Sequence, residues 1–448
     1  MLGPMLQYQS LKTVLLHTDA NTRFRISACI PSIREVEKRV PLKMNTLEMA
    51  SYRTVVNDTE FQIGVIRHYP EGIAPLPVKK DQDWVVSYND FDEFGFPFTA
   101  GSDVLLPGDV SFERGDRAAE LRRDTERDER RFRDNLTVHE DAVKVLEESE
   151  AQGMTVDAYL DKMGSGIELN NALVHPKLLP YMIDHYKLEL LPFECRNNNT
   201  KPPFTCYIQV TVTKGESKQI HRFEYNKKLF EAIKDLQEVF FGRRSEPIRV
   251  DRLVLSSFGI IHRVPTGFRL HANHVRTSHY TLAHASFPSL VENSESLESI
   301  EVTDSEMETA FEAPAVRTAR RVVIEHAFMY AWRLTQVIQN LSNFEITIVD
   351  LFQLPEQALS VIQAWLTVDR PVGARCWIEL IDEKIAEEVL KLVQTSYEST
   401  KKTSRCVTIT KTNSTAVEVF YVPFEPPRGS SDCRQSIQWM LKTRIVNV

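Results

Sequence analysis

The sequence lacks the features that mark secreted, membrane-spanning or metal-stapled proteins. Its six cysteines include no C-x-x-C pair, and the nearest two, Cys195 and Cys206, stand eleven positions apart, which argues against a zinc site or a compact disulfide framework. No run approaches the roughly 18 apolar residues that a bilayer-crossing helix needs. No basic start precedes a long apolar stretch, as a secretory signal requires. We therefore expect an intracellular protein, cytoplasmic or nuclear, that makes no membrane contact.

Motifs of catalysis and cofactor binding are also missing. The sequence contains no G-x-x-x-x-G-K-[ST] phosphate loop, no G-x-S-x-G elbow and no H-E-x-x-H pair. Gly164 and Gly166 lack the third glycine of a dinucleotide cradle. Histidines gather between His262 and His284, but His271 and His274 point to opposite faces of a strand and are poorly spaced for one metal ion. We expect no enzyme activity, no catalytic residue, no cofactor and no metal.

What the sequence does contain is an uneven distribution of charge. The 448 residues carry a net charge of -8, and residues 286–315 hold eight acidic residues without a Lys or Arg. Just upstream, residues 242–279 hold seven arginines against Glu246 and Asp251. Two neighbouring segments of opposite charge are expected to face each other or one common partner. Arg269, His271 and Asn273 share a strand face there, which suits either an acidic ligand or solvent.

The N-terminal half reads as short helices, a strand-rich layer and a charged helix. Leu11, Val14 and Leu15 form a helical stripe, Asp19 or Asn21 can cap a second helix, and Pro31 opens a third. β-forming residues alternate with turn formers between 42 and 109. Residues 112–152 hold thirteen acids and nine bases, with acid-first pairs four apart that favour an exposed helix.

The C-terminal half predicts strands and helices in alternation. Residues 206–212 and 221–225 form a hairpin pattern, followed by a helix over 229–240 that Asn226 can cap and Gly242 can end in a left-handed turn. Strands are expected to centre on Leu253, Leu270, Ile300, Val323, Ile346 and Ile378, and helices on 334–341, 358–366 and 385–397. The last four strand centres lie 23, 23 and 32 residues apart, which favours a degenerate leucine-rich-repeat-like solenoid; an open α/β sheet is the alternative.

Cysteine and tryptophan side chains in this half are expected to be structural. Cys376 has no downstream histidine to act as a base, so we interpret it as a small buried hydrophobe. Tryptophans on helices and strands usually belong to the core, and we expect the same of Trp332, Trp365, Trp377 and Trp439.

The predicted fold class is α+β, in four parts. Residues 1–45 form a short N-terminal helical segment, and residues 46–111 form the β-rich layer. Residues 112–200 form a charged helical insertion and linker, and residues 201–448 form a C-terminal αβ region with repeat-like units.

Several phrases of the sequence resemble a known family. They are LQYQSLKTVLL at 6–16, ANTRFRI at 20–26 and IPSIR at 30–34, with shorter phrases at 105–109, 207–209, 371–373 and 405–409. These phrases are distributed along nearly the whole chain. They resemble a large, nematode-expanded family of uncharacterised proteins related to F-box-associated proteins. The resemblance implies an F-box-like helical segment over 1–45.

In F-box proteins, three N-terminal helices dock on the Skp1-type adaptor of a cullin ubiquitin ligase, while a C-terminal repeat region recruits another protein. Carried over by position, Leu6, Leu11, Val14 and Leu15 would face the adaptor. The alternative is that this stripe packs inward on the chain's own β layer. We therefore predict a non-enzymatic protein-interaction module, an F-box-like adaptor with an unknown recruited protein. Nucleic-acid binding through the Arg-rich 243–276 stretch is the alternative function.

Overall fold

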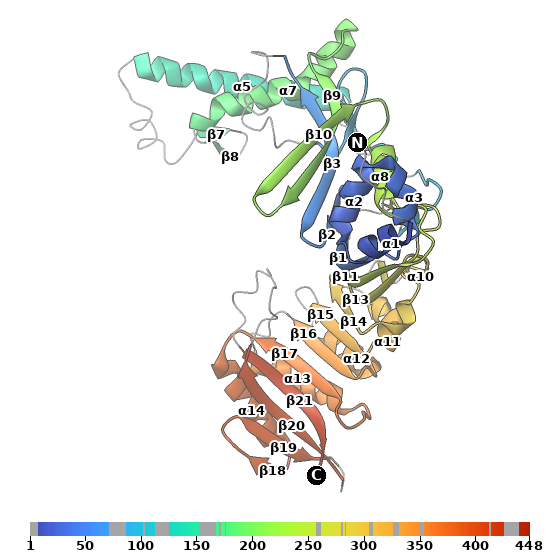
Figure 1. Cartoon of the computed structure of the whole chain (residues 1–448). Coiled ribbons are helices and arrows are strands. Elements are labelled where there is room, and N and C mark those ends of the chain that lie inside the picture. The colour runs from blue at the N-terminus through green and yellow to red at the C-terminus, as the bar shows by residue number, and fades with distance from the viewer. Residues whose placement is uncertain are drawn as a thin grey trace. The chain divides into compact units, whose positions relative to one another are not determined.

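The computed structural model describes residues 8–70, 87–101, 104–112, 125–151, 167–169, 172–174, 176–256, 261–278, 281–282, 284–303, 308–325, 331–349, 354–411, 414–424 and 439–448. Across these ranges the protein is a mixed α+β fold with a large strand-rich sheet (Figure 1). The chain divides into two compact units. Unit 1 comprises Met1–Glu60, Leu105–Arg114 and Gln237–Val448, and unit 2 comprises Phe61–Val104 and Gly115–Leu236. None of the helices in the described ranges is both long enough and apolar enough to cross a membrane.

Unit 1 begins with the three short helices that the sequence predicts, α1 (Tyr8–Leu16), α2 (Ala20–Cys29) and α3 (Pro31–Lys38). Asp19 caps α2, because its carboxylate accepts a hydrogen bond from the N–H of Thr22 at 3.0 Å. Pro31 opens α3 at a position where a missing N–H costs no helical hydrogen bond. Both α1 and α2 pack on α3, so the three helices form one packed group.

The strands of unit 1 lie side by side in the order β2-β1-β11-β13-β14-β15-β16-β17-β21-β20-β19-β18. The first eight in this order are β2 (Arg53–Val56), β1 (Lys43–Met49), β11 (Ile248–Leu255), β13 (Leu270–Ser278), β14 (Ser299–Thr303), β15 (Arg321–Glu325), β16 (Glu345–Val349) and β17 (Arg375–Leu380). From β1 to β17 all neighbours are parallel. The six predicted strand centres are confirmed.

Beyond β17 the sheet becomes antiparallel. Its last strands are β21 (Trp439–Asn447), β20 (Thr415–Pro423), β19 (Cys406–Thr410) and β18 (Ser399–Lys402). A separate two-stranded pair joins β6 (Val110–Ser111) to β12 (Ile261–His262) within the same unit. The sheet of unit 1 therefore combines a parallel run with an antiparallel end, as the red strands of Figure 1 show.

Helical segments lie between the parallel strands from β13 to β17, and a further helix, α14, follows β17. They are α10 (Phe287–Leu290), η2 (Ser294–Ser296), η3 (Glu308–Glu312), α11 (Pro314–Thr318), α12 (Ala331–Asn340), α13 (Pro355–Leu366) and α14 (Glu383–Ser396). The helices α12, α13 and α14 confirm the three predicted amphipathic helices. They pack side by side, and α13 and α14 also pack on β17 (Figure 1). One face of β16 and β17 is almost fully buried, and it carries Ile346, Ile348, Cys376 and Ile378. Along each strand these residues alternate with residues of the opposite face.

Buried polar side chains bind the carbonyl groups at the ends of these helices. The amide of Asn343 donates to the carbonyls of Val316 and Ala319 at 2.7 and 2.6 Å. The guanidinium of Arg370 donates to four carbonyls, those of Ile338, Leu341, Asn343 and Trp365. Such carbonyls have no partner within their own helix, and burying them unpaired would cost about 1–3 kcal/mol each. These two side chains thus make it possible to bury the turns between helix and strand.

Unit 2 contains a small sheet and a pair of long helices. Its sheet has the order β10-β9-β3, from β10 (Ser217–Glu224), β9 (Thr205–Lys214) and β3 (Thr59–His68). The antiparallel β9–β10 pair confirms the predicted hairpin. The charged helix is confirmed as α5 (Glu126–Ala151), which packs on α7 (Leu179–Asn198) around buried Phe96, Phe132, Leu190 and Phe193. Short strand pairs are β4 (Asp90–Phe91) with β5 (Pro97–Phe98) and β7 (Ile167–Leu169) with β8 (Ala172–Val174), and η1 (Pro176–Leu178) precedes α7.

The helix expected after the hairpin is confirmed as α8 (Leu229–Phe241), but the residues predicted to cap its start and to form the left-handed turn at its end are wrong. The N–H of Leu229 donates to the carboxylate of Asp90 at 2.9 Å, and the N–H of Lys228 donates to the carboxylate of Glu231. These two carboxylates therefore cap the start of the helix, a role that was expected of Asn226. At the other end the left-handed residue is Arg243, with φ of 57°, and Gly242 is not left-handed. The N–H of Gly242 still bonds to the carbonyl of Glu238, which delays the turn by one residue.

Candidate interaction surfaces

The four side chains predicted to face a partner belong to the first helix, and the structure places three of them. Leu15 is only 1% exposed, Leu11 is half-buried, and Val14 is 49% exposed. Leu6 lies outside the described residues. The predicted stripe is therefore divided in the structure, because Leu15 packs inside unit 1 while Val14 faces outward.

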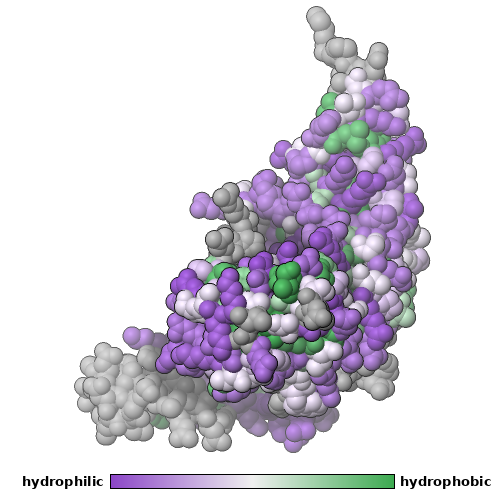
Figure 2. All heavy atoms as spheres, turned by 90° about the horizontal axis from the view of Figure 1, so that it is seen from below, coloured by the Kyte–Doolittle hydropathy of each residue, from purple (hydrophilic) through white to green (hydrophobic). Residues whose placement is uncertain are grey.

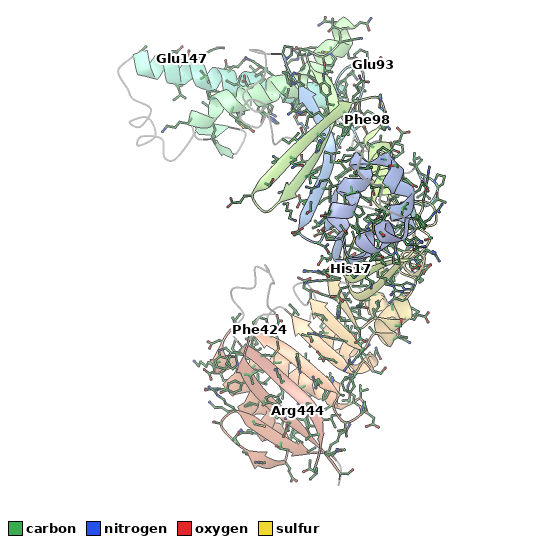
Figure 3. All side chains as sticks on the ribbon, in the orientation of Figure 1. His17, Glu93, Phe98, Glu147, Phe424 and Arg444 are labelled. Carbon is green, nitrogen blue, oxygen red and sulfur yellow. The ribbon has the colours of Figure 1, made fainter. Side chains whose placement is uncertain are left out.

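Three other apolar side chains of the N-terminal helical group are also exposed. We call Tyr8, Val14, Leu16 and Ile30 the N-terminal apolar surface; the side chain of Leu16 is 53% exposed. Successive residues of a helix point about 100° apart, so Val14 and Leu16 flank the buried Leu15 on either side of α1. His17, labelled in Figure 3, follows Leu16 at the end of this helix. Figure 2 shows that the face in view is mostly hydrophilic, with hydrophobic residues in separate areas.

The helices that carry this surface rest on a buried ionic cluster. The guanidinium of Arg23 lies 2.8 Å from the carboxylate of Glu37, and Arg244 approaches the same carboxylate at 3.1 Å. Lys38 donates to the carbonyls of Val239 and Phe240 at 2.6 and 3.0 Å. Burial, together with the nearby charge of Arg244, lowers the pKa of Lys38 to about 7. These contacts join α2 and α3 to the C-terminal end of α8. Because α1 packs on α3, they also fix the position of the helix that carries Val14 and Leu16.

The Arg-rich and acidic segments face each other, which confirms one of the two arrangements that the charge pattern allowed. Arg252 and Arg276 approach Glu301 at 3.7 and 3.5 Å. Arg269 and His271 approach Glu292 at 3.9 and 3.0 Å. Two further arginines of the segment form buried pairs, Arg244 with Glu37 and Arg263 with Asp109. Most of the positive charge in the 243–276 stretch is therefore already balanced inside unit 1.

A second exposed surface lies on the sheet face that carries Trp377. The strand register places Trp377 of β17 between Thr347 of β16 and Lys442 of β21, with Phe420 of β20 next in the same row. The adjacent row, two residues along, reads Glu345, Arg375, Arg444 and Glu418. Arg444 is labelled in Figure 3. We call Arg321, Arg375, Trp377, Phe420, Lys442 and Arg444 the Trp377 surface.

The expectation that the four tryptophans belong to the core is correct for Trp365 alone, which is fully buried. Trp332 is exposed, and Trp377 and Trp439 are half-buried. The prediction missed Trp377 because it considered residue type and not strand periodicity. Arg375, Trp377 and Glu379 alternate with the buried Cys376 and Ile378, and this alternation is the signal that places Trp377 on the face opposite the buried residues.

Among the described residues, the titratable side chains considered from the sequence do not converge on one site, although the rings of His262 and His284 both pack on Phe112, at 5.3 and 5.7 Å. Burial raises the pKa of the Cys376 thiol to about 12, so this thiol is no nucleophile at neutral pH. Burial lowers the pKa of His262 to about 4. The ring of His274 contacts the hydroxyl of Ser299, whereas that of His271 contacts Glu292, and His279 lies outside the described residues. In the ranges that the structure covers, no three His, Cys, Asp or Glu side chains form a potential metal site.

Comparison with known proteins gives one match. Residues 228–382 match a family described as "Domain of unknown function (DUF3557)". The matched segment runs from the start of α8 through β17 to Asp382, the residue that caps α14. No curated protein and no solved structure matches the chain.

Proposed function

We propose that this protein is a non-enzymatic interaction module, an F-box-like adaptor that holds a Skp1-type subunit of a cullin ubiquitin ligase and recruits another protein to it. The observation that carries the proposal is the exposure of Val14 and Leu16 on the two sides of α1 that flank buried Leu15. Fully burying such a side chain contributes about 1.5–3 kcal/mol relative to leaving it in water, so covering two half-exposed ones contributes roughly half of that each.

The geometry of α1 favours a partner with a groove. Val14 and Leu16 flank Leu15, so a flat surface meets one of them at a time, while a groove wrapping the outer half of the helix covers both. The ionic cluster of Arg23, Glu37 and Arg244 holds the neighbouring helices in place. Binding to a preformed surface loses less conformational freedom than binding to a segment that must first fold.

The C-terminal sheet supports the recruiting role. From β13 to β17, strands that follow one another in the chain are parallel neighbours in the sheet, with helical segments between them. We interpret this as the degenerate leucine-rich-repeat-like region expected from the strand spacing, with Asn343 and Arg370 binding the turn carbonyls. Repeat proteins of this kind bind other proteins on an extended strand face.

Nucleic-acid binding is the less favoured function. It relies on Arg243–Arg276, where Arg244 and Arg263 are committed to buried ion pairs and Arg252, Arg269 and Arg276 lie near glutamates. A phosphate backbone would have to displace these carboxylates before it could gain the counterion release that drives such binding.

The test is co-purification of the full chain with a Skp1-type adaptor. We expect wild type to retain the adaptor and both Val14→Asp and Leu16→Asp to weaken the complex at least tenfold, because a charge would enter an apolar contact. Thr395→Asp is the control, since Thr395 is an exposed polar residue of α14 and lies outside the N-terminal apolar surface. Because leucine and valine contacts are not screened by salt, retention should change little between 0.1 and 0.5 M NaCl, about a twofold change in Debye length.

Two results would overturn the adaptor role. One is a folded wild-type chain that captures no adaptor. The other is equal adaptor retention by Val14→Asp, Leu16→Asp and Thr395→Asp, which would show that the N-terminal apolar surface takes no part.

A further inference from the structure

We propose that the Trp377 surface binds an acidic peptide segment of the recruited protein, with its carboxylates held by Arg375 and Lys442 beside the indole of Trp377. The inference rests on the proposed function, because it assigns a chemical class to the partner that the C-terminal sheet would recruit.

Three cations from three strands surround the Trp377 ring. Its centroid lies 4.8 Å from the Lys442 ammonium nitrogen, 5.8 Å from the guanidinium carbon of Arg321 and 6.0 Å from that of Arg375. On the next strand Arg444 stacks on Phe420 at 5.1 Å. Trp and Arg are among the residue types most enriched at the energetic centres of protein interfaces.

Two of these cations are left without an acidic partner. Glu345 pairs with Arg321 at 3.0 Å, and Glu418 pairs with Arg444 at 2.6 Å. In the part of the chain that the structure describes, Arg375 and Lys442 have no carboxylate within 4.0 Å. Arg375 also lies directly opposite Arg444 on the neighbouring strand, a like-charge pairing that destabilises a sheet. A carboxylate placed between the two guanidinium groups would relieve this repulsion.

The spacing of charge suits a peptide better than a nucleic acid. Glu345 and Glu418 lie in the same row as Arg375, and buried Glu379 follows Trp377 on the same face. A duplex carries one negative charge per about 1.7 Å of its axis and would place phosphates against these carboxylates. An extended peptide presents side chains to one face about every 7 Å, so one or two acidic residues can reach Arg375 and Lys442 while apolar neighbours contact Trp377.

The test measures binding of a fluorescein-labelled peptide of alternating Glu and Ser residues to the full chain by fluorescence anisotropy. We expect it to bind at least tenfold more tightly than the same peptide with Gln in place of Glu. Arg375→Glu and Lys442→Glu should each weaken binding tenfold or more. Lys391→Glu is the matched control, because Lys391 is an exposed residue of α14, and it should change the Kd less than twofold. Circular dichroism verifies that each variant is folded.

Three outcomes would overturn the inference: equal binding of the Glu and Gln peptides, equal loss in Arg375→Glu and Lys391→Glu, or tighter binding of a single-stranded oligonucleotide of the same charge. The adaptor role is tested separately on the same proteins. A chain that captures the adaptor but not the acidic peptide refutes this inference alone. Peptide binding without adaptor capture refutes the adaptor role alone.

Discussion

Arg23 and Glu37 form an ion pair at 2.8 Å in which neither side chain is more than 2% exposed. Arg244 approaches the same carboxylate, so one anion balances two buried cations. Burial lowers the pKa of both guanidinium groups, and Glu37 opposes that effect. Because charges removed from water are costly unless paired, Glu37 is the residue on which the cluster depends.

Replacing Glu37 should destabilise unit 1 strongly. Glu37→Gln leaves Arg23 and Arg244 buried without a counter-charge, and we expect a loss of about 3–5 kcal/mol in the free energy of unfolding. The measurement is the midpoint of urea denaturation followed by circular dichroism. Glu35→Gln, an exposed change on the same helix, should shift the midpoint hardly at all. Similar midpoints for the two variants would contradict the role of Glu37.

A single-atom change at Asn343 tests the buried turn. Asn343→Asp replaces the amide that donates to Val316 and Ala319 with an oxygen, so acceptors would face acceptors. We expect a loss of about 2–4 kcal/mol at neutral pH, from unpaired buried carbonyls and a buried charge. Asn340→Asp, on an exposed residue at the end of α12, is the control. Differential scanning fluorimetry should separate the two variants by several degrees.

Acid should weaken unit 1 through His262. The folded pKa of about 4 lies below the ordinary value of 6.5, so the unfolded chain binds more protons between these pH values. Stability should therefore fall as the pH drops from 6.5 to 4, by up to about 3 kcal/mol at 1.36 kcal/mol per pH unit. His262→Gln should lose this component of the pH dependence, whereas exposed His17→Gln should keep it. The measurement is the urea midpoint of wild type, His262→Gln and His17→Gln at pH 7 and pH 4.5. An equal shift of the midpoint between these pH values in all three proteins would refute the prediction.

Two left-handed residues should respond to glycine in opposite ways. Arg243 has φ of 57° and an exposed side chain, so Arg243→Gly should stabilise the chain by about 0.5–1 kcal/mol through relief of backbone strain. Asn57 has φ of 54°, but its side-chain oxygen accepts the N–H groups of Asn45 and Thr46. Asn57→Gly gains the same relief and loses both hydrogen bonds, so we expect net destabilisation. Thermal unfolding of the two variants in parallel gives the sign of each.

Local pattern predicted most elements of this fold. The alternation in β9 and β10, the apolar faces of α12 to α14 and the cap at Asp19 depend on residues close together in the sequence, and all were found. The cap of α8 was missed because Asp90, whose carboxylate accepts the N–H of Leu229, lies 139 residues from it. Rules based on the spacing of residues within one helix or strand cannot predict a contact between residues so far apart in the sequence. The same limit applies to Glu37, because its second partner, Arg244, lies 207 residues away and gives no local signal.

The interaction surfaces were only partly predictable. Helical periodicity grouped Leu11, Val14 and Leu15, but it could not decide which of them faces inward, because that depends on where α3 packs. The Trp377 surface depends on strand register between β17 and β21, two segments separated in the chain by α14 and the three strands β18, β19 and β20. Register is a tertiary property, and the sequence contains only the alternation that places Trp377 on one side.

Parallel pairing of β1 with β11, in which Lys43 lies beside Arg249, means that the first strand of unit 1 has no neighbour on that side until about 200 further residues have been made. At roughly 5–20 residues per second, a ribosome needs on the order of 10–40 s to supply that partner. Throughout this delay the apolar side chains of Met44 and Leu47 lack the cover that they have in the finished protein. During synthesis β1 must therefore remain without its neighbour β11 for tens of seconds, and its apolar side chains are then accessible to chaperones.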